Sequence, residues 1–319
     1  MKYLIKMKLI YTLPFLLLLF MAKAQNTPIP GPVESSKAWI DLDYVGDNHI
    51  GHKLDIFLPK EGKGPFPVIV TVYGSAWFSN SSKSQCFLND FGQTLLRNGY
   101  AVVSVNHRSS RDAIWPAQIH DIKAAIRYIR ANADQFSLDT RFLGISGYSS
   151  GGHLSTMAGV TSGLEEFVLG GLEISLDNKI GKHPEMDSSV DAVVDWFGPT
   201  DFLIMDSCGS SFSHDGADSP ESTLVGGPIQ ENKAKVALAN PISYVKKENP
   251  PMLIFHGTAD PLVPHCESEK LYEAQQKAGA VSRLVIVPEG GHGPGVMIEK
   301  YYDEMVAFFN QQKSKNLTR

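Results

Sequence analysis

A glycine-rich stretch at residues 142–159, FLGISGYSSGGHLSTMAG, holds the serines best placed to react. Its residues 147–151 match the pattern G-x-S-x-G, in which a serine stands on a tight turn between a strand and a helix. Residues 141–146 can form that strand, and residues 152–159 can begin the helix. Glycine is expected two positions before and after the serine, because side chains there would collide with neighbouring elements. A plain Gly/Ser loop is the alternative, so Ser149 needs a base and an acid elsewhere in the chain.

Two further side chains could supply that base and acid. A serine hydroxyl is unreactive at its own pKa and is activated by a histidine that an acid orients. Asp260 follows an apolar run at 251–257, and His292 follows another at 282–288. Because the carboxyl ends of parallel strands meet at one edge of a sheet, we predict a Ser149–Asp260–His292 catalytic triad. The rival candidates are His256, His265 and His120 for the base and Asp201 for the acid.

Acyl transfer also needs backbone N–H groups that stabilise a developing oxyanion. One is expected from Ser150, the residue after the nucleophile. The other is expected from the loop VYGSAWF after the strand at 66–74, where Ser75 and Ala76 are the candidate donors. Gly74 allows the tight bend that this loop requires.

The same two loops indicate where a substrate would bind. Tyr73, Trp77 and Tyr148 are predicted to wall the acyl side, with room for a short chain or for stacking on an aromatic acyl group. A long polar insertion at 199–240 is predicted to form the leaving-group pocket, with Asp201 as a substrate-binding residue. A surface excursion without a role is the alternative. Its other groups suited to bind sugar hydroxyls are Asp206, His214, Asp215, Asp218 and Glu221.

The elements that position these residues alternate between strand and helix. Residues 39–45 and 53–58 alternate apolar and polar side chains, which predicts an antiparallel hairpin at a sheet edge. Continuous apolar runs predict buried parallel strands at 66–74, 100–107, 141–146, 190–198, 251–257 and 282–288. Helices are predicted before Gly99, over 119–129 and over about 295–311. This pattern predicts an α/β protein with a doubly wound, mostly parallel sheet.

The N-terminus has the pattern of an export signal. A lysine-rich start, an apolar run of only 12 residues and Ala22-Lys23-Ala24 predict a cleaved signal peptide over 1–24. The run is short of the roughly 20 residues that a membrane-spanning helix needs. We therefore expect a secreted or periplasmic protein without a stable membrane anchor. Residues 25–38 form an extended lead-in, and 39–312 form the catalytic domain.

Composition and cysteine content exclude several classes. A formal net charge of −5 gives no basic footprint for nucleic acid. Cys86, Cys208 and Cys266 are too few and too dispersed for a disulfide framework or a zinc site. Because export permits oxidation, we predict a disulfide between Cys208 and Cys266, with Cys86 free. The sequence does not define the oligomeric state.

Two other short motifs resemble known binding sites, but the neighbouring sequence lacks the other residues that such sites need. HIGH at 49–52 resembles the phosphate-binding string of nucleotide-activating synthetases, but it lies between two strands with no Gly-rich loop nearby. HDGAD at 214–218 could suggest a metal site, but no further ligands accompany it. We therefore predict neither a cofactor nor a metal.

Together these stretches resemble a known family. VYGSAW, WPAQIHDIKAAIRYIRANA, GYSSGGHLSTMAG, DSPESTLVGG, HGTADPLVP and PEGGHG are similar to secreted carboxylesterases of the acetyl-xylan and feruloyl esterase type, related to the hormone-sensitive-lipase group. The resemblance implies an α/β-hydrolase fold over nearly the whole mature chain. One departure is that the group usually has His-Gly-Gly in the oxyanion loop, where this chain has Tyr73-Gly74-Ser75.

The resemblance implies a serine carboxylesterase that removes acetyl, other short acyl or feruloyl groups from carbohydrate through an acyl-enzyme. Two alternatives remain. One is a peptidase of the prolyl-oligopeptidase kind, which shares the triad and the fold but usually carries a large N-terminal propeller that 24 to 40 residues of lead-in cannot supply. The other is a hydrolase-fold binding protein without turnover, which the presence of all three triad residues disfavours.

Overall fold

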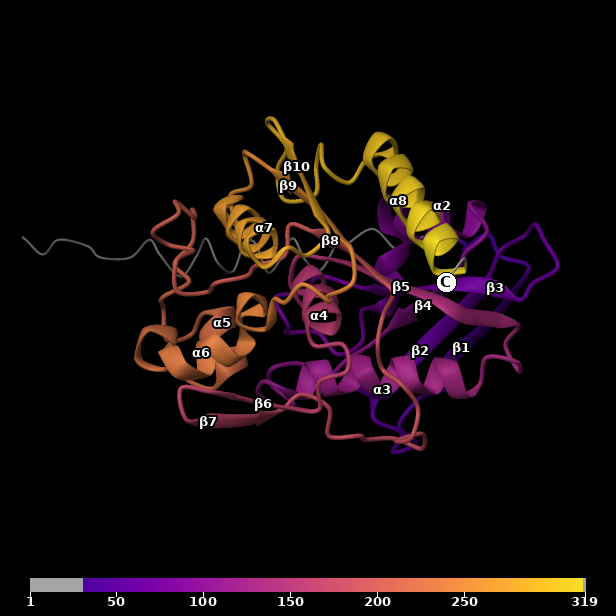
Figure 1. The fold of residues 1–319 in the computed structure, drawn as a ribbon, viewed down its shortest axis with the longest axis horizontal. Coiled ribbons are helices and arrows are strands. Elements are labelled where there is room, and N and C mark those ends of the chain that lie inside the picture. Colours follow the sequence, from indigo (N-terminus) through magenta and orange to yellow (C-terminus); the bar gives the residue numbers. More distant parts are fainter. Residues whose placement is uncertain (1–30, 318–319) are drawn as a thin grey trace, which may run out of the picture.

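The computed structural model describes residues 31–317, built around an eight-stranded sheet (Figure 1). The strand order is β1-β2-β4-β3-β5-β8-β9-β10. The strands are β1 (Lys37–Asp43), β2 (Lys53–Leu58), β3 (Phe66–Val72), β4 (Ala101–Val105), β5 (Leu138–Tyr148), β8 (Ala192–Trp196), β9 (Met252–Gly257) and β10 (Ser282–Val287). Only the β1–β2 and β2–β4 pairs of this sheet are antiparallel. The predicted sheet, with its antiparallel hairpin at one edge, is confirmed.

Helices cover both faces of the sheet, which explains why its central strands are apolar on both sides. These helices include α2 (Phe91–Arg97), α3 (Ala117–Ala131), α4 (Ser150–Val160), α7 (Cys266–Ala278) and α8 (Glu299–Leu317). In β3, Val68 and Val70 join the core under α3 and α4, whereas Ile69 joins the core under α2 and α8. Figure 1 shows α2 and α8 together on one side of the sheet and α3 on the other.

The boundaries differ from those predicted in a few places. Strand β5 is longer than 141–146 and continues to Tyr148, next to Ser149. Helix α8 begins at Glu299, not near 295, because Gly293 and Gly295 adopt positive φ and keep that segment a loop. The ordered elements extend slightly beyond 39–312, from Lys37 to Leu317. The predicted signal peptide at 1–24 lies outside the described residues.

The 199–240 insertion is more ordered than a polar loop. It contains α5 (Pro220–Val225), the 3₁₀ turn η3 (Ile229–Glu231) and α6 (Lys233–Ala239), and η4 (Pro241–Tyr244) follows it. Ser219 caps α5 through its side chain, and Gly226 ends it in the left-handed conformation. Phe202, Met205 and Leu224 are buried in the core. The segment therefore folds onto the sheet instead of extending from it.

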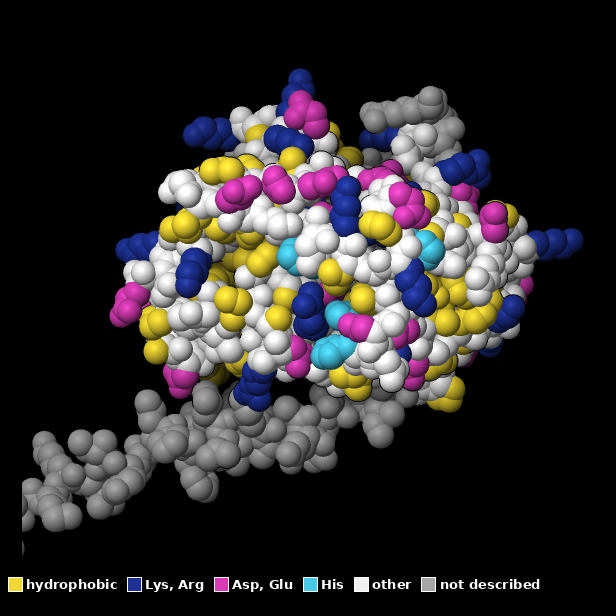
Figure 2. Space-filling model, turned by 90° about the horizontal axis from the view of Figure 1, so that it is seen from below, with side chains coloured by type: hydrophobic (Ala, Val, Ile, Leu, Met, Phe, Trp, Pro, Cys, Tyr) yellow, Lys and Arg dark blue, Asp and Glu magenta, His cyan; other side chains and the backbone are white. Residues whose placement is uncertain are grey.

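Several other short elements were not predicted. Strands β6 (Glu166–Leu169) and β7 (Leu172–Ser175) form a separate antiparallel hairpin, and the remaining 3₁₀ turns are η1 (Ile50–His52) and η2 (Lys83–Asp90). On the face drawn in Figure 2, acidic and basic side chains are interspersed, so this face presents no continuous basic surface. Among residues 31–317, no helix is both long and apolar enough to span a membrane.

Candidate active site

The turn between β5 and α4 holds Ser149 at the carboxyl edge of the sheet. Its φ of 55° and ψ of −128° lie outside the usual regions for a residue with a side chain. A Cβ on Gly147 would lie 2.3 Å from the carbonyl oxygen of Gly151, and one on Gly151 would lie 2.3 Å from that of Val72. The prediction that both positions require glycine is therefore confirmed. The Ser149 N–H donates to the carbonyl of Trp196 at 2.9 Å, which ties the turn to β8.

Two loops bring His292 and Asp260 to this serine. His292 Nε2 lies 2.9 Å from Ser149 Oγ, and His292 Nδ1 lies 2.7 Å from Asp260 Oδ2. The loops follow β10 and β9, so the predicted convergence at strand ends does occur. In this arrangement the Nδ1–H donates to the carboxylate, and Nε2 can accept the serine proton.

The surroundings of Asp260 keep it ionised. Its side chain is fully buried, and burial alone would raise its pKa. That effect is outweighed by hydrogen bonds from His256, His292 and the backbone N–H of Val263, which hold the pKa well below its ordinary value. A second N–H, from Leu262, also donates to Oδ1. Asp260 therefore remains a carboxylate that can orient and stabilise the imidazole ring of His292.

The rival residues have partners other than Ser149. His256 is buried between the hydroxyl of Ser268 and the carbonyl of Val263, and its Nε2 also lies 3.5 Å from Asp260 Oδ2. His120 contacts the carbonyl of Ser175 at 2.8 Å. His265 lies within 3.9 Å of a carboxylate on its own helix. The side chain of Asp201 accepts a hydrogen bond from a nearby backbone N–H two residues on.

The backbone around Ser149 offers two free donors. Ser150 supplies the first N–H of α4, and neither it nor the Ala76 N–H has an acceptor among residues 31–317. The Ser75 N–H, in contrast, donates to Ser150 Oγ at 2.8 Å. The prediction that Ser75 donates to the oxyanion is therefore wrong, because its N–H already donates to Ser150 Oγ. Ala76 and Ser150 remain the candidates.

This geometry can be compared with known proteins. The family model BD-FAE matches residues 54–275. The chain belongs to the BD-FAE family. Esterase LipC of Mycobacterium tuberculosis is 31% identical over 234 residues, which cover 72% of this chain and 53% of the relative. The chain spans about half the length of the curated relatives it matches.

Two solved structures are also similar to this chain. A truncated form of a carbohydrate esterase from gut microbiota is 44% identical, with a TM-score of 0.85, and the match covers 89% of this chain and 99% of that one. A bifunctional GH43-CE protein of Bacteroides eggerthii is 46% identical, with a TM-score of 0.83, over 88% of this chain and 38% of that one. This BD-FAE chain shares its α/β fold with the carbohydrate esterase structure.

Two predicted walls of the acyl site are buried. Tyr73 is 0% exposed and stacks on His107, while its hydroxyl donates to the carbonyl of Ser79. Trp77 is 1% exposed and packs edge-on against His153. Both side chains therefore belong to the core and cannot line the acyl pocket. Tyr148, next to the nucleophile, is half-buried and is the predicted aromatic that remains available.

The polar groups of the insertion are mostly paired with one another. Asp206 accepts the N–H groups of His214 and Asp215. His214 is buried, and its Nδ1 lies 3.1 Å from a carboxylate oxygen of the buried Glu221. Asp206, His214 and Glu221 therefore have partners within the insertion, whereas Asp215 and Asp218 are exposed. Asp201 is half-buried and lies on the loop that follows β8.

A buried carboxyl group anchors the start of this insertion. Glu267 Oε2 accepts the N–H groups of Thr200 and Asp201 at 2.7 and 2.6 Å. Burial raises the pKa of Glu267 to about 8, against the effect of these two bonds. The sequence did not indicate this role for Glu267, because acidic residues are generally favourable in the first turn of a helix.

The Cys208–Cys266 disulfide is confirmed, and Cys86 is free and buried. The disulfide joins the insertion to Cys266, the first residue of α7, which directly precedes Glu267. Within residues 31–317, Cys208, Cys266 and Glu267 form the one group of side chains near enough to share a metal ion. The disulfide occupies both sulfurs, so the group does not form a metal site.

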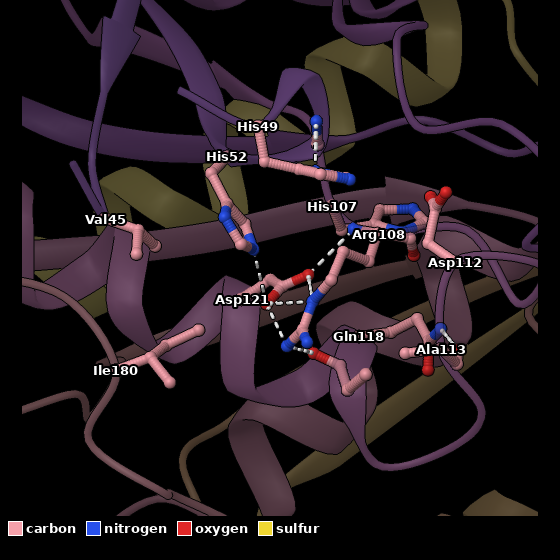
Figure 3. Close-up of polar contacts among 12 residues, drawn as sticks. Val45, His49, His52, His107, Arg108, Asp112, Ala113, Gln118, Asp121 and Ile180 are labelled. Atoms are coloured by element: carbon pink, nitrogen blue, oxygen red, sulfur yellow. Dashed lines mark hydrogen bonds and ion pairs between the residues drawn. The ribbon is translucent and has the colours of Figure 1, made fainter. Parts of the chain in front are cut away.

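The HIGH string at 49–52 belongs to a separate polar network (Figure 3). His52 lies between Asp47, at 2.9 Å, and Asp121 of α3, at 3.3 Å. Arg108, which follows β4, pairs with the same buried Asp121 at 2.7 Å. Burial lowers the pKa of His52, but the two carboxylates outweigh it and raise the pKa above its ordinary value. The network joins the β1–β2 connection to α3, which is a structural role.

Proposed function

We propose that this chain hydrolyses short acyl esters of carbohydrate through an acyl-enzyme on Ser149. The observation that carries the chemistry is the continuous hydrogen-bonded chain from Ser149 through His292 to Asp260. The carbohydrate leaving group is supported by the two solved structures at 44% and 46% identity, which are described as a carbohydrate esterase and a GH43-CE protein.

The reaction follows from the positions of these atoms. Ser149 Oγ attacks the ester carbonyl while His292 Nε2 takes the serine proton, and Asp260 stabilises the imidazolium. The carbonyl oxygen becomes an oxyanion and accepts the N–H groups of Ser150 and Ala76. When the bond between the acyl carbon and the sugar oxygen breaks, His292 returns the proton to that leaving oxygen. Water then attacks the acyl-enzyme by the same route and releases the acid.

The surroundings of the site support a short acyl group. The large apolar side chains of the insertion, Phe202, Met205 and Leu224, are buried in the core and do not form an exposed lid for a long chain. Tyr148 could stack on an aromatic acyl group such as feruloyl. Residue Tyr148 pairs with Trp196 across β5 and β8, so the loop after β8 starts beside the nucleophile. Asp201 on that loop is the candidate sugar-binding residue.

Export is part of this proposal. The 1–24 segment has the pattern of a signal peptide, and the disulfide is of the kind that persists in oxidising compartments. Carbohydrate esters outside the cytoplasm are then the expected substrates.

Kinetics of triad variants test the mechanism. Ser149→Ala and His292→Ala should each lower kcat on p-nitrophenyl acetate by about 10⁴-fold, and Asp260→Asn by a comparable or smaller factor. All three should keep the wild-type circular dichroism spectrum. Near-normal turnover by Ser149→Ala would contradict the mechanism, as would a loss in His256→Ala equal to that in His292→Ala.

Product analysis tests the substrate class. Mass spectrometry of acetylated and feruloylated xylan oligomers should show loss of acyl groups with the glycosidic bonds intact. Acetate esters should be cleaved faster than octanoate esters. Faster turnover of a dipeptidyl anilide than of p-nitrophenyl acetate would instead favour a peptidase.

A further inference from the structure

The side chain of Ser150 contacts the loop that carries the other oxyanion donor. Its hydroxyl oxygen accepts the Ser75 N–H at 2.8 Å, across 75 positions of sequence. Ser150 is 1% exposed, so water does not compete for this bond. One residue therefore presents an N–H to the oxyanion and holds the neighbouring loop through its side chain.

The loop has a conformation that needs such support. Ala76 and Trp77 have φ values of 51° and 58°, in the left-handed region that residues with side chains rarely adopt. Two adjacent residues of this kind cost free energy, and surrounding contacts must offset it. Within the loop, the Phe78 N–H bonds the Ser75 carbonyl and the Ser79 N–H bonds the Ser75 hydroxyl.

Those internal bonds fix the shape of the loop but not its position relative to Ser149. A separate bond, from the Ser110 N–H to the carbonyl of Trp77, ties the loop to the segment after β4. Among the hydrogen bonds that residues 74–79 make within residues 31–317, only the one from Ser75 to Ser150 reaches the helix of the nucleophile. Gly74 fits this close approach, because a Cβ there would lie 2.7 Å from Ser149 Cβ.

We propose that Ser150 is a positioning residue of the oxyanion hole. Its hydroxyl fixes the position of the Ala76 N–H relative to the Ser150 N–H. This inference rests on the proposed function. It also explains how the sequence Tyr73-Gly74-Ser75 can build a hole without the usual His-Gly-Gly, since a side chain of α4 fixes the loop.

Ser150→Ala is the direct test, because it removes the hydroxyl and keeps the backbone N–H. The variant should lower kcat on p-nitrophenyl acetate by roughly 10- to 100-fold, somewhat less than the loss of a whole donor. KM should change by less than about threefold, since the bond acts on the transition state. Affinity for a trifluoromethyl ketone, which forms a tetrahedral adduct, should fall by the same factor as kcat/KM.

Ser155→Ala is the matched control. Ser155 is also buried on α4, and its hydroxyl has no hydrogen-bond partner within the described part of the chain. This variant should keep wild-type kcat and ketone affinity. Ser150→Thr retains a hydroxyl and should recover most of the activity lost in Ser150→Ala. If the extra methyl group prevents folding of that variant, the parallel loss of ketone affinity and kcat/KM in Ser150→Ala decides the question.

Ser149→Ala, assayed in parallel, separates the two proposals. If it is inactive while Ser150→Ala has wild-type kcat and ketone affinity, the positioning role is wrong and the proposed mechanism stands. A Ser150→Ala variant that raises KM without lowering kcat would also contradict the positioning role. If Ser149→Ala remains active, both proposals fail together.

Discussion

The disulfide between Cys208 and Cys266 closes a segment of 58 residues that includes most of the insertion. Replacing both cysteines with serine frees this segment in the unfolded chain. The loop-closure entropy for this length corresponds to about 4 kcal/mol at 25 °C. We therefore expect the double variant to lose up to about 4 kcal/mol of unfolding free energy.

Thermal unfolding measures this loss. For a domain of this size, about 4 kcal/mol corresponds to a decrease in Tm of roughly 7 °C. A reductant should lower the Tm of the wild type by the same amount and leave the double variant unchanged. Cys86 is buried and free, so it should add no reductant effect of its own.

Thiol titration provides the control for complete reduction. If the wild type has all three thiols reduced and its Tm still falls by less than about 1 °C, the loop-entropy reasoning is wrong. Two reactive thiols in unreduced protein prepared under oxidising conditions would show that the disulfide does not form.

Three further predictions concern stability. Gly151→Ala should cost about 3 kcal/mol or more in chemical denaturation, because the new Cβ would lie 2.3 Å from the Val72 carbonyl oxygen; a loss below about 1 kcal/mol would contradict this. Glu267, with a pKa raised from 4.5 to about 8, should make the unfolding free energy fall with pH across that interval, by about 1 kcal/mol per pH unit. Glu267→Gln should remove this slope, and an unchanged slope would exclude Glu267 as its source. The pKa of His52 is raised by carboxylates that include Asp121, so its stabilisation is present at acid pH and lost as pH rises through the folded-state pKa. His52→Gln should therefore destabilise more at about pH 5.5 than at about pH 8.5, and an equal cost at both would refute that ionic contribution.

The sequence was sufficient to predict the sheet and the convergence of the three triad side chains. Buried parallel strands are recognisable as continuous apolar runs, and residues directly after them must meet at one edge. Ser149, Asp260 and His292 each follow such a run, so their meeting required no knowledge of side-chain packing.

The sequence did not indicate that the two predicted acyl walls, Tyr73 and Trp77, are buried in the core. At Trp77 the burial accompanies a positive φ at Ala76 and Trp77, and only glycine would have indicated such angles in the sequence. The polar groups of the insertion were misread for a related reason. Composition shows that Asp206 and His214 can form hydrogen bonds, but it does not show that their partners lie within the same segment.

The interactions of Glu267 and His52 depend on contacts distant in sequence. Glu267 accepts a hydrogen bond from Thr200, 67 positions away in the sequence, and His52 contacts Asp121, 69 positions away. No periodicity or local motif encodes such pairs, so they become visible only when the chain is folded.

Covalent labelling tests the central claim most directly. The enzyme is incubated with a p-nitrophenyl phosphonate, which a serine nucleophile attacks to give a stable adduct, and then digested for peptide mass spectrometry. We predict one phosphonyl group on Ser149, p-nitrophenol release equal to the amount of enzyme, and no label in Ser149→Ala. A label on another residue that accounts for the loss of activity would contradict the account. So would a Ser149→Ala variant that is still active and that the phosphonate inactivates completely.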